Sequence, residues 1–64
     1  MTERIANMVK AVEDALERGD DFLAVVLTRS HLGRLCPEIR DQLESVDSME
    51  DVRYVLGQIR KVYL

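Results

Sequence analysis

The stretch that decides the fold is Phe22-Leu23-Ala24-Val25-Val26-Leu27, the longest apolar run of this 64-residue chain. Six consecutive apolar residues fit a buried helix or a buried strand, and Val25 and Val26 also suit a strand. No second segment offers a partner strand, and a lone strand would leave its backbone groups unpaired. We therefore expect a helix that continues to about Leu32. Being apolar nearly all round, it should be the central helix, covered on more than one side.

The segment before this run, Thr2 to Arg18, has the spacing of an amphipathic helix. Its apolar residues recur at intervals of three and four and form one stripe: Ile5, Met8, Val9, Val12 and Leu16. Thr2 is a candidate N-cap, and Gly19 suits the C-terminal end. Asp20 or Asp21 then provides a cap for the central helix.

The last segment repeats this pattern after a cap at Asp47 and Ser48. Ser48 followed by Asp51 resembles a capping box with a shortened acidic residue. The stripe again has spacings of three and four: Val52, Val55, Leu56, Ile59, Val62 and Tyr63. The sequence thus predicts a second long amphipathic helix that runs to the C-terminus.

A shorter helix is expected between the central and last helices. Gly33 is a candidate C-cap for the central helix, and the Cys36-Pro37 pair favours a new start because proline suits the first helical position. The new helix should run from Pro37 to about Glu44. The fold class expected is therefore all-α: a single domain over residues 1–64, with about four helices, two long amphipathic ones flanking two shorter ones.

A chain of this length buries a thin core, and small domains often gain further stability from a disulfide, a metal ion or a partner. Cys36 is the only cysteine and His31 the only histidine, which excludes an intrachain disulfide and a conventional structural zinc site. No metal or cofactor site is predicted. Association with a partner or with a second copy is the remaining stabilising device.

Charge and hydropathy narrow the class of protein. The formal net charge is −3, and neither half of the chain is basic, which argues against nucleic-acid binding. The first 30 residues contain no apolar stretch behind a basic start of the kind found in secretory leaders, and the longest apolar run is too short to span a membrane. We expect a cytoplasmic protein that does not bind membranes.

Cys36 is the one candidate for chemistry. A cysteine just before a helix-starting proline can have a stabilised thiolate, so a reactive or redox-sensing thiol is one interpretation. The alternative, which we favour, is a small buried hydrophobe at a helix junction. No phosphate loop or nucleophile motif occurs, so no catalytic residue is assigned and an enzyme is not expected.

The function expected is a small protein–protein interaction module, such as a regulator, inhibitor or adaptor of bacterial or phage type. The candidate contact residues are Tyr54, which lies off the stripe of the last helix, together with Met49, Tyr63, Arg34 and Arg53. Two alternatives stay open. One is a homodimeric structural subunit, and the other is a helix-turn-helix-like DNA-binding regulator, although its reading helix would carry three acidic residues.

Overall fold

The computed structural model describes residues 2–64, and its regular elements are all helical. They are α1 (Thr2–Glu17), α2 (Asp21–Val26), the π-helix η1 (Leu27–Leu32), α3 (Gly33–Leu35), the 3₁₀-helix η2 (Pro37–Ile39), α4 (Arg40–Glu44) and α5 (Met49–Val62). The all-α prediction is confirmed, and no strand occurs in the described residues.

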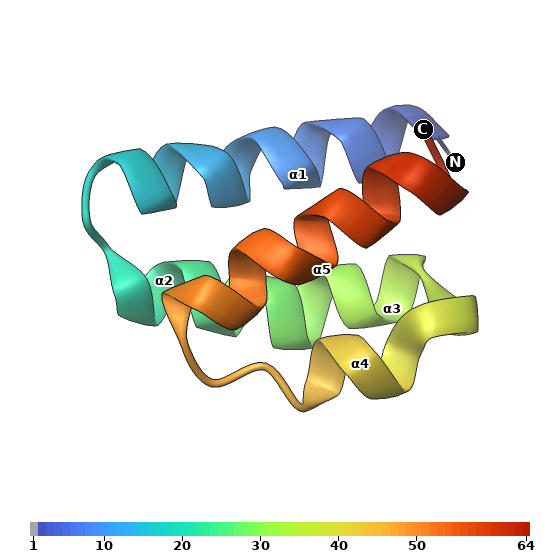
Figure 1. Cartoon of the computed structure of the whole chain (residues 1–64). Helices are drawn as coiled ribbons and strands as arrows, with labels where there is room; N and C mark the ends of the chain where they lie inside the picture. The colour runs from blue at the N-terminus through green and yellow to red at the C-terminus, as the bar shows by residue number, and fades with distance from the viewer. Residues whose placement is uncertain (1) are drawn as a thin grey trace.

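Within residues 2–64 the consecutive elements join into four helical stretches: α1, the run α2–η1–α3, the run η2–α4, and α5. The helices α2, η1 and α3 follow one another without a break and make a central rod over residues 21–35. α1 packs along this rod, and α4 and α5 pack against it as well. The start of α5 lies beside α2 at one end of the molecule (Figure 1).

The two amphipathic helices are confirmed. α1 buries Ile5, Val9, Val12 and Ala15, whereas Met8 and Leu16 of the expected stripe are half-buried. α5 buries Val52, Val55, Leu56 and Ile59. These side chains, with Leu32, Leu43 and Val46 from the middle of the chain, form one continuous core.

Most of the expected helix ends are also present. Gly19 adopts the left-handed conformation, with a φ of 75°, between α1 and α2. The Asp20 side chain caps α2 by accepting a hydrogen bond from the backbone N–H of Leu23 at 3.2 Å. The Ser48 hydroxyl caps α5 in the same way. Thr2 is already helical, so it is not the cap of α1.

The expectation that the central helix is covered on more than one side is confirmed, since α1, α4 and α5 all pack against it, but one of its faces stays open. Its fully buried residues are Ala24, Thr28 and Leu32, which are spaced by four and form one narrow stripe. Phe22 and Val26 lie on another face and are 80% and 38% exposed. Six consecutive apolar residues in a helix point in every direction around its axis. Phe22 and Val26 are exposed because the other helices do not cover the face on which they lie.

The prediction that Gly33 caps the end of the central helix was wrong. Gly33 is helical, with φ −58° and ψ −33°, and the helix continues to Leu35. It stops at Cys36, whose φ of −124° and ψ of 72° are not helical, because the following proline disfavours helix at this residue. Burial of Leu32 and Cys36 favours the extra turn, and Pro37 ends it.

The middle of the rod is a π-helix over Leu27–Leu32, a wider turn than an α-helix. Two hydroxyls bond back to backbone carbonyls at this point. Thr28 donates to the carbonyl of Ala24 at 2.8 Å, and Ser30 donates to that of Val26 at 2.6 Å. The buried Thr28 hydroxyl is therefore satisfied within its own helix.

Candidate functional site

The most unusual surface feature is Phe22, the only phenylalanine of the chain, which is 80% exposed. It follows Asp20 and Asp21, which begin α2, and it precedes Val26 by one turn on the same face. Among residues 2–64, the other large apolar side chains that are at least half exposed are Tyr54, Val62 and Leu64. Phe22 is therefore the first residue to consider as part of a contact surface.

Phe22 lines an open hollow between the first turns of α2 and α5, which we name the α2–α5 hollow. It has a volume of about 500 Å³ and is lined by Asp21, Phe22, Val25, Asp47, Ser48 and Met49. The apolar members, Phe22, Val25 and Met49, come from two helices, and two carboxylates lie beside them. Both helix caps, Asp20 and Ser48, hold these first turns in place.

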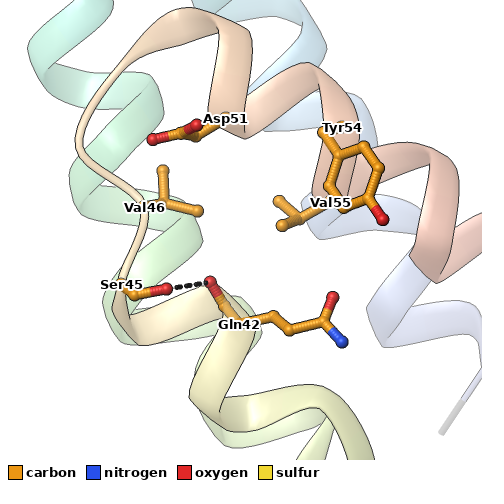
Figure 2. A pocket seen from close by; sticks show the side chains of 6 residues that line it. All are labelled: Gln42, Ser45, Val46, Asp51, Tyr54 and Val55. Carbon is orange, nitrogen blue, oxygen red and sulfur yellow. Dashed lines mark hydrogen bonds between the residues drawn. The ribbon is translucent and has the colours of Figure 1, made fainter.

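A second hollow lies between α4 and α5 and is shown in Figure 2; we name it the α4–α5 hollow. It has a volume of about 250 Å³ and is lined by Gln42, Ser45, Val46, Asp51, Tyr54 and Val55. Val46 and Val55 are almost fully buried and form an apolar floor. The Tyr54 ring lies at its edge opposite Val46, with the Gln42 amide nearby (Figure 2). The connection that links α4 to α5 contributes residues to both hollows, Ser45 and Val46 to one and Asp47 and Ser48 to the other.

The charged residues that line the two hollows are all acidic: Asp21 and Asp47 in the α2–α5 hollow and Asp51 in the α4–α5 hollow. Residues 19–28 and 45–52 carry five carboxylates, two in the first segment and three in the second, and neither segment contains Lys or Arg. Four of these acids, Asp20, Asp21, Glu50 and Asp51, cap or begin a helix, where the helix dipole favours them. Because α2 and α5 both begin at this end of the molecule, their N-termini favour an acidic surface, and we name this surface with its two hollows the acidic end.

Asp51 shows how this end is ordered. Its carboxylate accepts a hydrogen bond from the backbone N–H of Asp47 at 3.3 Å, while its own N–H donates to the Ser48 hydroxyl at 3.2 Å. The first of these bonds, with a smaller contribution from Ser48, holds the pKa of Asp51 below its usual value. The predicted capping-box-like pair is confirmed, with the return bond made to Asp47 instead of Ser48.

The structure divides the five predicted contact residues among different places. Met49 is half-buried in the α2–α5 hollow, and Tyr54, 65% exposed, lies at the edge of the α4–α5 hollow. Arg53 lies between α1 and α5, where Arg60 and Glu13 form an ion pair. Only Met49 and Tyr54 therefore belong to the acidic end.

The remaining two predicted residues lie elsewhere. Arg34 is exposed on α3. Tyr63 is half-buried at the end of α5, and its hydroxyl bonds to Glu38. A tyrosine that is fixed in this way contributes to the internal packing of helices and offers little free surface.

Cys36 lies in the core and is fully buried. Burial raises the pKa of its thiol, and the nearby Glu38 carboxylate raises it further. The thiol form is therefore stabilised over the nucleophilic thiolate. This environment agrees with the alternative interpretation, in which Cys36 is a small buried hydrophobe.

Sequence reasoning missed Phe22 as a surface residue, although a signal was present. Phe22, Val26 and Ser30 are spaced by four, so they share one face, and that face becomes polar at Ser30 and the neighbouring Arg29. All four residues are exposed. The polar end of this face indicates that its apolar start also lies on the surface.

Residues 2–64 contain no group of three or more His, Cys, Asp or Glu residues placed to hold a metal ion. None of its helices is long and apolar enough to cross a membrane. The helix expected to read DNA, Pro37 to Glu44, consists of the 3₁₀-helix η2 followed by α4, which has five residues. Its Arg40 pairs with Glu44 at 2.9 Å.

Comparison with protein families, with curated proteins and with solved structures found no match to this chain.

Proposed function

We propose that this chain is a small, non-enzymatic protein-interaction module that binds another protein through its acidic end. The observation that carries the proposal is the exposed ring of Phe22 beside Met49 in the α2–α5 hollow. The contact surface comprises Phe22, Val25 and Met49, with Tyr54 in the neighbouring α4–α5 hollow.

Stability alone does not account for the position of Phe22. Full burial of a phenylalanine side chain contributes about 1.5–3 kcal/mol, which is large for a domain of this size. The core instead uses smaller residues, mainly Val, Ile, Leu and Ala. A large aromatic side chain left in water beside a partly apolar hollow is typical of a binding surface.

The two hollows also have the composition of an interface. Met49 offers a flexible apolar side chain that can adapt to a partner, and Tyr54 combines an aromatic ring with a hydroxyl. Aromatic residues and methionine are enriched at protein interfaces. The buried floor formed by Val46 and Val55 gives a partner side chain an apolar surface to contact.

Site-specific photo-crosslinking tests the proposal in cells of the organism that encodes the chain. A photoreactive phenylalanine analogue replaces Phe22 in one variant and Lys10, which is exposed on α1, in a control. We expect a discrete adduct with one other protein from position 22 and none from position 10. Equal labelling at both positions, or no protein adduct at position 22, would refute the proposal.

The same experiment separates the two alternative functions. A homodimeric subunit would give an adduct of twice the mass of the chain, containing only its own peptides. A DNA-binding regulator would give adducts with nucleic acid. The acidic end disfavours the second result because its carboxylates would face phosphates.

A further inference from the structure

The acidic end has a charge pattern that selects among classes of partner. The charged side chains that line its two hollows are Asp21, Asp47 and Asp51, and no Lys or Arg lines either hollow. The N-terminus of a helix offsets such charge by roughly half a positive charge, so α2 and α5 together offset roughly one. The surface therefore stays strongly negative around its apolar centre.

From this arrangement we propose that the partner presents a basic segment in which Lys or Arg residues flank a large apolar side chain. This inference rests on the proposed function and names the chemistry of its partner. The apolar side chain lies in the α2–α5 hollow against Phe22, Val25 and Met49. The flanking cations pair with Asp21 and Asp47, which line the same hollow.

A second copy of the chain is a poorer occupant of this surface. A twofold dimer places the same patch of each subunit against the other. Asp21 and Asp47 of one copy would then lie close to the same acids of the other. Like charges in such a position oppose association, which favours a basic partner over self-association.

Selection from a random peptide library displayed on phage tests the partner's chemistry. The folded chain is the bait, and peptides that also bind a Phe22→Ala variant are removed. We expect the remaining peptides to be enriched in Lys and Arg on both sides of a Leu, Ile, Met or aromatic residue. Affinity of synthetic copies should fall as salt rises from about 50 mM to about 500 mM, because exposed charge pairs are screened.

Variants of the lining carboxylates measure the charge contribution directly. Asp21→Asn and Asp47→Asn should each weaken peptide binding about two- to fivefold, the range for exposed ion pairs. Glu3→Gln is the matched control, since it removes a carboxylate from the first turn of α1, away from both hollows. It should leave the affinity unchanged. Circular dichroism of each variant verifies that it is folded.

The outcomes distinguish this inference from the proposed function. Peptides that depend on Phe22 but are acidic or uncharged would overturn the basic partner and leave the interaction module standing. A failure to recover any peptide that depends on Phe22 would overturn both. Sedimentation of the free chain as a stable dimer that Phe22→Ala dissociates would assign the surface to a second copy and contradict the inference.

Discussion

The Tyr63 hydroxyl and Glu38 bind each other twice, although 25 positions separate them in the sequence. The hydroxyl donates to Oε1 of Glu38 at 2.8 Å and accepts from the Glu38 backbone N–H at 3.2 Å. Tyr63 ends α5, and Glu38 lies in the 3₁₀-turn that follows the buried Cys36. This pair therefore fastens the C-terminal end of the chain to its middle.

Replacing Tyr63 by Phe should lower the urea midpoint, because the variant loses both bonds at the end of α5. Tyr54→Phe is the matched control, since its ring is largely exposed and it should unfold like the wild type. Burial, followed by the bond to Glu38, raises the pKa of Tyr63, so folding favours the neutral phenol. Its contribution should be present below about pH 10 and be lost as the pH rises through the raised folded value. A Tyr63→Phe variant with the wild-type midpoint at neutral pH would contradict the role of this pair.

Cys36 should resist thiol reagents in the native protein and react readily in urea. The thiol is fully buried, and its raised pKa disfavours the thiolate. Stability from the neutral thiol is present below the unfolded pKa, near about 8.5, and is lost as the pH rises through the higher folded pKa. Stopped-flow labelling with a chromogenic disulfide at neutral pH measures this protection. Labelling at the same rate with and without urea would show that the thiol is exposed.

The cap of α5 should contribute measurable stability. Ser48→Ala removes the acceptor for the Asp51 N–H and should cost about 1 kcal/mol in the free energy of unfolding. Ser45→Ala is a control in the same connection, because the Ser45 hydroxyl bonds only to a carbonyl near the end of α4. It should cost less than Ser48→Ala. Equal losses for the two variants would argue against the cap.

Asp51 should make the stability of this end depend on acid. Its folded pKa lies below its unfolded value, so the carboxylate stabilises the fold above about pH 4. That contribution is lost as the pH falls through the folded value. Asp51→Asn should therefore be less stable than the wild type at pH 7, and the gap should close in acid. Urea titrations at several pH values measure this gap, and a gap that widens in acid would contradict the assignment.

Side-chain burial separates residues that support the fold from those available to a partner. Ile59→Val removes one buried methylene and should cost about 0.5–1.5 kcal/mol. Phe22→Ala removes a whole ring but should change the free energy of unfolding by less than about 0.5 kcal/mol, because that ring is exposed. Chemical denaturation of both variants checks the order, and a larger loss for Phe22→Ala would place Phe22 in the core.

Sequence periodicity was sufficient to predict α1, α5 and their buried stripes, because each helix packs one face against the rest of the chain. The helix after Gly19 and the caps at Asp20 and Ser48 were also predictable, since they depend on bonds between near neighbours. The position at which the central rod ends could not be predicted in this way. Glycine is only a weak local signal, and burial of Leu32 and Cys36 carries the helix past Gly33 to the stop at Pro37.

The candidate site was predictable only in part, for a different reason. Tyr54 and Met49 were chosen because they lie off or before the apolar stripe of α5, and that relation is local. The exposure of Phe22 depends on which helices cover the central rod, and the convergence of α2 and α5 depends on the tertiary arrangement (Figure 1). The contact between Tyr63 and Glu38 is likewise a result of packing that no spacing rule contains.

The exposure of Phe22 in solution is the measurement on which the account depends most directly. The chain has a single phenylalanine, so substitution with fluorophenylalanine gives one ¹⁹F resonance, which a soluble paramagnetic agent broadens in proportion to its access. We predict that broadening in the dilute native protein approaches that of the urea-unfolded chain. A native resonance that stays sharp while the unfolded one broadens would show a buried ring and would contradict the binding surface proposed here.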